Sequence, residues 1–316
     1  MALAKRNAET LARSLRTALA PSGTLRDKLS AAELHVAYGL ADQADRAIEA
    51  ARAAMQAQGV TPAAPAARLI ERLDTINRRF REAQLAAKVN ALGTFGARLL
   101  DNKEEVVLSV ARRSRTLLVV FSTMHNNFWV SCPVLHCLLP TGTVSVLYLK
   151  DPREMMYLCG LQTYGATFAA LADGIRSVAR ELAINDIRVA AFSSGGYAAL
   201  LMASLLEANA YLGFSVRTDL SPTSPLPTDR YVMRKALRDA AAAHLIDLKP
   251  MLRERASPKR GILYYGNLAR IDVAHARHLA DLPDFIVKEV PNTWHNTIVT
   301  LLADGTFEGI LRRFLR

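Results

Sequence analysis

The segment from Asp186 to Leu206, DIRVAAFSSGGYAALLMASLL, constrains the fold more than any other part of the chain. Its beginning, Ile187–Phe192, is a short apolar run, which is the pattern of a strand buried on both faces. Two serines and two glycines follow, and after them comes a stretch rich in Ala and Leu that favours helix. The sequence therefore predicts a buried strand, a very tight turn and a helix in immediate succession.

The residues around Ser193 fit a turn that exposes a nucleophile. A serine at the apex of such a turn takes a strained backbone conformation, which projects its hydroxyl away from the sheet. Strand and helix approach each other closely there, so the residues two before and two and three after the serine must be small. Ala191, Gly195 and Gly196 meet this demand. We therefore take Ser193 as the candidate nucleophile.

An apex at Ser194 is less compatible with the sequence, because Phe192 would then occupy the first small position. With Ser193 at the apex, the Ser194 amide lies at the helix N-terminus, where free N–H groups favour negative charge. That amide is the expected half of an oxyanion hole. A turn that only connects two elements, or one that binds phosphate, is the alternative. Neither the Walker Gly-Lys-Ser/Thr nor the dinucleotide glycine spacing is present.

The length and composition suit one large α/β domain with an appendage. The chain has 316 residues, of which 51% are hydrophobic, so it can form a sizeable core. The net charge is +11, with basic and acidic residues mixed throughout. We interpret this excess as a solvated surface, with an acidic partner or an anionic membrane surface as the alternative. We expect no nucleic-acid partner.

The cysteines and the hydropathy pattern favour a reduced, cytoplasmic protein. There are three cysteines, Cys132, Cys137 and Cys159, and an odd number without metal-type spacing argues against a disulfide framework. The N-terminal residues lack the continuous apolar core of a signal peptide. The most apolar long stretch, Val130–Leu149, is broken by prolines and a glycine, so we predict no membrane-spanning helix. No metal or cofactor is expected.

The first 90 residues have the pattern of a helical arm or hairpin. A capping-box pattern at Ser30–Glu33 predicts a helix that runs to about Gln58, and Thr61-Pro62 offers a second N-cap. The next helix has an apolar stripe at helical spacing, formed by Leu69, Leu73, Ile76 and Phe80. We predict two or three antiparallel helices. Their expected role is packing, homo-oligomer formation or contact with a protein partner, and the basic N-terminal helix is a candidate for peripheral membrane contact.

From residue 91 to residue 316, short apolar strands alternate with helices. The predicted strands are Glu105–Val110, Thr116–Phe121, Thr143–Leu149, Ile187–Phe192, Tyr211–Val216, Gly261–Tyr265 and Phe285–Val290. The predicted helices between them are Thr167–Leu182, Gly196–Ala208 and Val273–Ala280. This alternation predicts an α/β domain with a mostly parallel, doubly covered sheet. Ligands of such sheets bind at the carboxyl ends of the strands.

His295 is the candidate base. A serine nucleophile needs a histidine to take its proton and a carboxylate to orient that histidine. The chain has seven histidines, but only His295 lies just beyond the last predicted strand, in PNTWHNTIVTLL. The small-x-Ser-x-Gly-Gly pattern at Ser193 resembles the nucleophile elbow of α/β-hydrolases, in which the chain order is Ser, acid, His. A surface histidine without chemistry is the alternative.

Two carboxylates compete for the acid. The residue three positions after the glycine that ends GILYYG, the common site, is Ala269. Asp272 lies three residues further on and could reach His295 if the loop turns back. Asp219 follows the preceding strand and is the alternative acid. Either carboxylate could instead cap a helix, since Asp272 directly precedes VAHARHLA.

The second oxyanion donor is expected in the loop Ser122–Asn127, after the strand Thr116–Phe121. The backbone amides of Thr123 and Met124 are the candidates, and His125 is a candidate for the wall of the substrate pocket. Asp151 follows the next strand, and we expect it to hold a loop rather than bind substrate. The loop from residue 221 to residue 257, which opens with a Pro-rich run, is a candidate lid.

Residues 91–316 resemble the α/β-hydrolase superfamily. More narrowly, the segments FSTMHNNFWVSCPVLH, VLYLKDPREMMYLCGL, AFSSGGYAALL and YYGNLARIDVAHARHL are similar to a bacterial group of hydrolases. That group is associated with surface polysaccharides or with helical-repeat segments. The resemblance implies catalytic roles for Ser193 and His295, with Ala191 replacing the first glycine of the group's motif. It says little about substrate.

The sequence therefore predicts a serine hydrolase that acts on an ester, thioester or amide of a small molecule or glycan. An acyltransferase acting on polysaccharide would use the same residues. A non-catalytic binding or assembly protein is the alternative from another class, and Ala269 at the common acid site motivates it.

Overall fold

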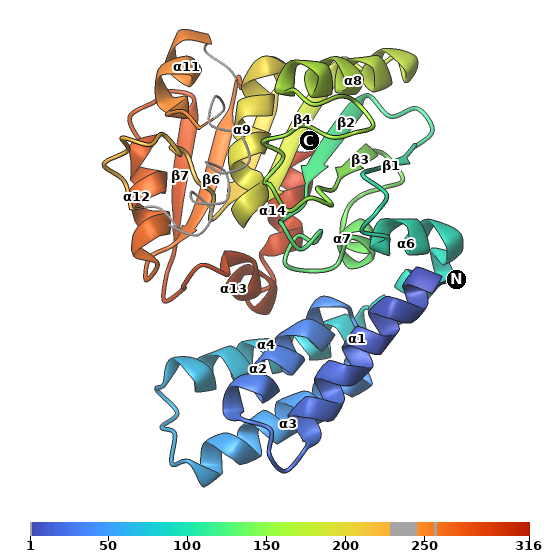
Figure 1. Ribbon diagram of the computed structural model, residues 1–316, viewed down its shortest axis with the longest axis vertical. Coiled ribbons are helices and arrows are strands. Elements are labelled where there is room, and N and C mark those ends of the chain that lie inside the picture. The colour runs from blue at the N-terminus through green and yellow to red at the C-terminus, as the bar shows by residue number, and fades with distance from the viewer. Residues whose placement is uncertain (1, 228–244, 256–257) are drawn as a thin grey trace. The chain divides into compact units, whose positions relative to one another are not determined.

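The structure is a computed structural model that describes residues 2–227, 245–255 and 258–316 (Figure 1). The chain divides into two compact units. The first contains Met1–Asp101, Trp129–Leu139 and Val299–Glu308, and the second contains the remaining segments. The sequence-based division at residue 90 stays a proposal. Much of the candidate lid, residues 228–244 and 256–257, lies outside the described residues.

The N-terminal part of the first unit is built entirely from helices. These are α1 (Ala2–Leu19), α2 (Leu25–Ala37), α3 (Ala41–Ala57), α4 (Pro65–Glu82), α5 (Leu85–Ala91) and α6 (Gly93–Leu100), and α7 (Cys132–Leu138) belongs to the same unit. The helical character of this region is as predicted. The described residues contain more helices than the two or three that the sequence suggested.

The predicted helix from Ser30 to Gln58 is wrong, because the chain turns in its middle. Thr24 forms the capping box that starts α2, with Asp27 as its partner, so Ser30 lies inside a helix. Gly39 then takes a φ of 68°, a left-handed conformation that glycine adopts without steric cost and that ends the helix. A new helix, α3, begins at Ala41.

The predicted start of the next helix is also displaced. Thr61 accepts a hydrogen bond from the Ala64 amide in a turn, and α4 begins only at Pro65. Proline suits this first position because its missing N–H has no partner there in any helix. In the predicted stripe, Leu73, Ile76 and Phe80 are buried, and Ile70 takes the buried position expected for Leu69.

A seven-stranded sheet forms the centre of the second unit. Its strands are β1 (Val106–Ser109), β2 (Thr116–Phe121), β3 (Ser145–Leu149), β4 (Asp186–Phe192), β5 (Ala210–Phe214), β6 (Gly261–Gly266) and β7 (Phe285–Val290). They lie in the order β1-β3-β2-β4-β5-β6-β7, and every neighbouring pair is parallel except β1 and β3. The prediction of a mostly parallel sheet is confirmed, and each predicted strand is present.

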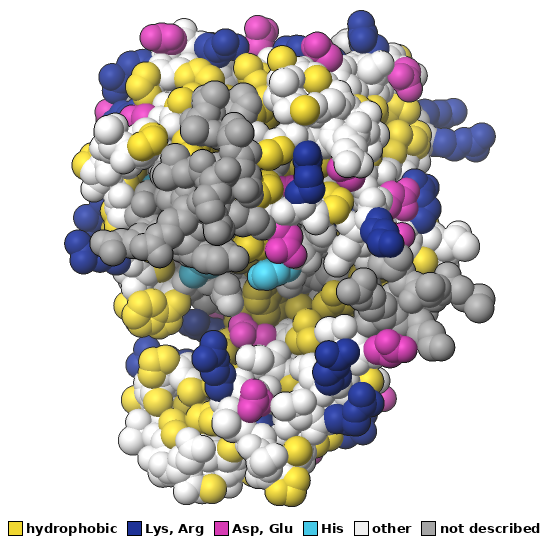
Figure 2. Space-filling view, viewed as in Figure 1, with side chains coloured by type: hydrophobic (Ala, Val, Ile, Leu, Met, Phe, Trp, Pro, Cys, Tyr) yellow, Lys and Arg dark blue, Asp and Glu magenta, His cyan; other side chains and the backbone are white. Residues whose placement is uncertain are grey.

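Helices of the second unit cover the sheet. They are α8 (Phe168–Glu181), α9 (Gly196–Leu205), α11 (Leu248–Arg255) and α12 (Arg270–His278). After β7 the chain forms α13 (Thr297–Ala303), which belongs mostly to the first unit, and α14 (Phe307–Phe314), which belongs mostly to the second. One core joins α8, α9 and α11 to alternate residues of the central strands, such as Leu117, Val119 and Val189. On the face in view, basic and acidic side chains are interspersed (Figure 2).

Asp151 organises the loop that follows β3. Its carboxylate is fully buried and accepts hydrogen bonds from the amides of Arg153 (3.1 Å), Met155 (2.7 Å) and Tyr157 (2.8 Å). Met156 and Tyr157 have positive φ, so this loop depends on outside support for its conformation. The expected structural role of Asp151 is thereby confirmed.

Among the described helices, none has the length and apolar character that a membrane crossing requires. No disulfide joins the three cysteines.

Replacing Asp151 is expected to destabilise the second unit strongly. Each buried amide left without an acceptor costs about 1–3 kcal/mol. Asp151→Ala should therefore lower the free energy of unfolding by about 3–5 kcal/mol, and Asp151→Asn by less, because its single carbonyl oxygen can still accept from Met155 and Tyr157. Urea unfolding monitored by circular dichroism measures both. As a control, Asp173→Ala removes an exposed ion pair with Arg176 and should cost below about 1 kcal/mol. Equal effects of Asp151→Ala and Asp173→Ala would contradict this role.

Candidate active site

Ser193 lies at a sharp turn between β4 and α9. It takes a φ of 53°, in the left-handed region where a non-glycine residue is strained, and it opens a single 3₁₀ turn. The two glycines that follow are required by close packing. A Cβ on Gly195 would lie 2.4 Å from the carbonyl oxygen of Ser122, and one on Gly196 would lie 2.2 Å from Val216. The predicted strand, tight turn and helix are thus present, with Ser193 at the apex.

The structure brings Ser193, His295 and Asp272 together. The Ser193 Oγ lies 2.6 Å from Nε2 of His295. The other ring nitrogen, Nδ1, lies 3.0 Å from both carboxylate oxygens of Asp272. Because an ionised carboxylate only accepts, Nδ1 carries the proton and Nε2 accepts from the serine hydroxyl. The imidazole is therefore oriented as a base toward Ser193.

Glycine at the end of β6 allows the histidine loop to come close. A Cβ on Gly266 would lie 2.1 Å from the carbonyl oxygen of Trp294, the residue before His295. One turn further, the Leu268 amide donates to the carbonyl of Thr293 at 2.9 Å. These contacts hold the segment after β7 against the segment after β6, which is how His295 reaches an acid 23 residues earlier in the chain.

Asp272 occupies the first turn of α12 and does not cap it. Helix α12 begins at Arg270, and Ala269, at the common acid position, is the residue that precedes it. The Asp272 side chain is only 1% exposed. Burial by itself raises the pKa of Asp272, but hydrogen bonds and charge from His295, and then from Arg217, outweigh it and hold that pKa below its usual value.

The alternative acid, Asp219, has partners of its own. Its carboxylate accepts from the Ser221 amide at 2.8 Å and from the Ser224 hydroxyl at 2.5 Å. Its backbone forms an isolated bridge with Asp247. Of the two candidate carboxylates, Asp272 is therefore the one hydrogen-bonded to His295.

His275 lies one turn beyond Asp272 on α12 and has a structural place. It is fully buried, its Nδ1 accepts from the Thr218 amide at 3.1 Å, and its Nε2 donates to the Pro227 carbonyl at 3.2 Å. Burial first, and the charge of Arg217 second, lower the pKa of His275 to about 4. This histidine is therefore neutral near neutral pH. His244 lies outside the described residues.

The loop after β2 approaches the turn at Ser193. The Thr123 amide donates to the carbonyl of Asn127 at 2.8 Å, so this candidate oxyanion donor is already engaged. The Met124 amide donates to the hydroxyl of Ser194 at 2.8 Å. The side chain of His125 is exposed, and its amide donates to the Thr123 hydroxyl at 3.2 Å. Of the two candidate amides, that of Met124 is in contact with the turn.

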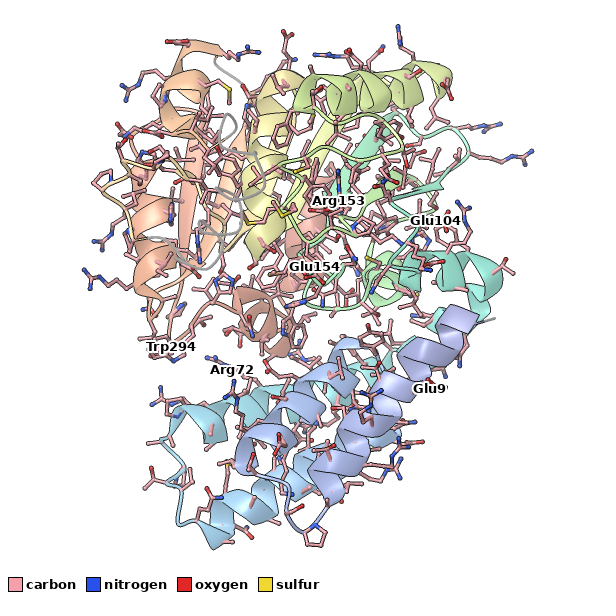
Figure 3. The ribbon with its side chains drawn as sticks, viewed as in Figure 1. Glu9, Arg72, Glu104, Arg153, Glu154 and Trp294 are labelled. Atoms are coloured by element: carbon pink, nitrogen blue, oxygen red, sulfur yellow. The ribbon has the colours of Figure 1, made fainter. Side chains whose placement is uncertain are left out.

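An aromatic side chain lies beside the histidine. The ring centroid of Phe192 lies 5.7 Å from that of His295, and the ring centroid of Phe128 lies 6.5 Å from that of Phe192. The His295 side chain is 37% exposed, and its neighbour Trp294 is 58% exposed. Figure 3 labels Trp294. The site therefore combines a buried carboxylate with a histidine that solvent reaches. Within the described ranges, no group of three or more His, Cys, Asp or Glu side chains could hold a metal ion.

Sequence reasoning missed Arg217. This residue follows β5, and its Nη1 donates to Oδ1 of Asp272 at 2.9 Å. A single arginine two residues before Asp219 has no local pattern that marks it, since its partner is 55 residues away. Only the approach of the β5 and β6 loops reveals the pair.

Of the comparisons with known proteins, only the one with solved structures finds matches. No family model matches the chain, and no curated protein matches it. Among solved structures, MenH from S. aureus has 15% sequence identity and a TM-score of 0.47, covering 67% of this chain and 97% of its own. A structure from a study of Nitrososphaera gargenis carboxylesterases has 13% identity and a TM-score of 0.45, covering 66% and 94%. The Glycosylation Associate Protein (Gap123) complex from Streptococcus agalactiae has 13% identity and a TM-score of 0.47, covering 66% and 44%.

The architecture of the second unit identifies its fold. The sheet is parallel apart from its edge strand β1, and Ser193 follows the central strand β4 at a strained turn into a helix. An acid after β6 and a histidine after β7 complete the chain order Ser, acid, His. The second unit therefore has the α/β-hydrolase fold, as the resemblance in sequence implied.

Proposed function

We propose that the protein is a serine hydrolase that cleaves an ester, thioester or amide through an acyl-enzyme. The observation that carries this proposal is the continuous chain of hydrogen bonds from Asp272 through His295 to Ser193. In this arrangement a serine is activated by an adjacent base, and the base is oriented by a carboxylate. Since Nε2 already lies 2.6 Å from Oγ, no rearrangement is needed before proton transfer.

In the first half of the reaction, Ser193 Oγ attacks the substrate carbonyl carbon and its proton passes to Nε2 of His295. The carbonyl electron pair moves onto oxygen, which becomes an oxyanion. Asp272 keeps its hydrogen bond to Nδ1 and stabilises the imidazolium that forms. The bond to the leaving group then breaks, and the leaving group takes the proton from Nε2.

The second half repeats these steps with water. His295 takes a proton from the water molecule as its oxygen attacks the acyl carbon. The bond from that carbon to Ser193 Oγ then breaks, and Oγ regains its proton. In an acyltransferase, a sugar hydroxyl would replace water at this step. The exposed side chain of His295 is accessible to either nucleophile. We propose a small-molecule or glycan ester as the substrate class and hydrolysis as the outcome.

We assign the oxyanion hole to the amides of Ser194 and Met124. The Ser194 amide starts the turn into α9, where the helix dipole favours negative charge. The Met124 amide faces the same turn but donates to the Ser194 hydroxyl in the substrate-free protein. That hydroxyl turns away when an oxyanion forms. The Thr123 amide, bonded to Asn127, is left out of this assignment.

The second candidate function, a non-catalytic binding protein, rested on the missing acid at Ala269. The contact between Asp272 and His295 supplies a carboxylate from another position and so favours catalysis.

For the helical segment, residues 1–90, we propose a packing or oligomerisation role, with a protein partner as the alternative. All three residues of the proposed triad lie in the second unit.

A fluorophosphonate probe tests the nucleophile. The wild-type protein is expected to become labelled on Ser193, while Ser193→Ala should show no labelling above a heat-denatured sample. Intact-mass spectrometry and peptide mapping provide the readout. A folded wild-type protein that remains unlabelled would support the binding-protein alternative.

The identity of the acid is tested by a matched pair of variants. Asp272→Asn should slow labelling by about 10³–10⁴-fold, because an amide favours the wrong histidine tautomer. Asp219→Asn changes a similarly buried carboxylate that does not contact His295, so its labelling rate should stay within about threefold of wild type, as expected for a site without transition-state contact. Thermal unfolding of both proteins controls for folding. The reverse ranking of the two variants would assign the acid to Asp219.

The oxyanion assignment makes a separate prediction for Ser194→Ala. Both proposed donors are backbone amides, so this variant keeps them and frees the Met124 amide from its present acceptor. Its kcat for a p-nitrophenyl ester should equal the wild-type value or exceed it by up to about tenfold. A fall of about 10²-fold or more would show instead that the Ser194 hydroxyl is a donor.

A further inference from the structure

Arg217 lies behind the proposed triad and contacts its acid. The residue follows β5, while Asp272 lies in the first turn of α12 after β6. Its Nη1 lies 2.9 Å from Oδ1 of Asp272, and the two side chains are 18% and 1% exposed. The ion pair is therefore largely withdrawn from water, where a charge interaction is stronger than at the surface.

The described hydrogen bonds to the Asp272 side chain come from His295 and Arg217. Oδ1 accepts from both, and Oδ2 accepts from Nδ1 of His295. A buried carboxylate without a countercharge is costly and tends to take up a proton. The guanidinium supplies a countercharge that does not depend on the protonation of the imidazole. Arg217 therefore makes an ionised Asp272 compatible with its burial.

The displaced position of the acid explains why this support comes from a side chain. Ala269, at the common acid position, precedes α12, whereas Asp272 lies inside the helix, so its carboxylate has to be held from a neighbouring strand. Arg217 extends from the end of β5, next to β6 in the sheet, and reaches the carboxylate at the oxygen that also contacts His295.

Other titratable groups near this pair belong to α12 and to the loops beside it. His275 is neutral near neutral pH, since its pKa is about 4. Asp219 is bonded to Ser221 and Ser224. His278 lies 3.4 Å from Asp247 through Nε2 and 3.0 Å from the Thr218 hydroxyl through Nδ1. Among the described arginines and lysines, Arg217 is thus the one in direct contact with the acid.

We propose that Arg217 is a positioning residue of the reaction, which keeps the Asp272 carboxylate ionised and holds it in hydrogen-bonding position against Nδ1 of His295. The inference rests on the proposed hydrolase function. The guanidinium, which is hydrogen-bonded to Oδ1 of Asp272, offsets part of the negative charge that favours imidazolium. Removal of Arg217 is therefore expected to change the pH dependence of the reaction as well as its rate.

The test is the rate of fluorophosphonate labelling of Ser193 between pH 5 and pH 9. In this step a bond forms from Oγ to phosphorus, fluoride leaves and the proton passes to His295, so the rate falls where the histidine is protonated. Arg217→Gln removes the charge and Arg217→Lys keeps it. Arg188→Gln is the matched control, because Arg188 is also partly buried (16% exposed) and paired with an aspartate, Asp186, at the opposite end of β4.

Arg217→Gln should lower the maximal labelling rate by about tenfold or more and move the midpoint of the acidic limb upward by about half a pH unit or more. Arg217→Lys should leave that midpoint near the wild-type value while recovering only part of the rate. Arg188→Gln should match wild type in both respects. If Arg217→Gln does not fold, Arg217→Lys still tests the proposal. A labelling rate of Arg217→Lys equal to that of wild type would overturn it.

The remaining outcomes separate this inference from the proposed function. A wild-type protein that does not react with the probe overturns the hydrolase function and this inference with it. If wild type reacts and Arg217→Gln has the same rate and midpoint, the role of Arg217 alone is overturned. If Arg217→Gln lowers the labelling rate without changing the midpoint, and Arg188→Gln lowers the rate equally, Arg217 has only a structural role. That result also overturns the proposed role of Arg217.

Discussion

The close approach of three chain segments at the end of β4 is the constraint on which the site depends. Gly195 packs against the carbonyl of Ser122 from the β2 loop, and Gly196 packs against Val216 after β5. Both approaches exclude a Cβ, so the strained φ of Ser193 is held from either side. The same packing brings Met124 to the turn. A nucleophile and a candidate oxyanion donor thus follow from one steric arrangement.

A second constraint, the burial of Asp272, links the strands on the other side of the site. Its carboxylate is compatible with the interior only because it has a histidine donor and a guanidinium countercharge. Gly266 lets the backbone before His295 come against β6, which sets the distance between histidine and acid. The ends of β5, β6 and β7 therefore depend on one another through a single buried charge.

Much of this fold could be predicted from local patterns. The strands were recognisable because a doubly covered parallel sheet needs short, continuously apolar segments, and β2, β3 and β5 are buried at every position. Helix boundaries in the first unit were harder to predict from the sequence. Ser30 and Thr61 both have the pattern of an N-cap, yet the helices begin after Thr24 and at Pro65. Which of several possible caps starts a helix depends on where turns, such as the one at Gly39, reverse the chain.

By itself, the sequence determined the order of the site's components along the chain and the identity of Ser193 and His295 as candidates, since small residues around a serine and a histidine after the last strand are local features. Whether Asp272 or Asp219 contacts the histidine was decided only by the tertiary structure. So was the pairing of Arg217 with that acid. Both depend on how loops from separate strands meet, and the electrostatics of a buried carboxylate arise from residues 23 and 55 positions away.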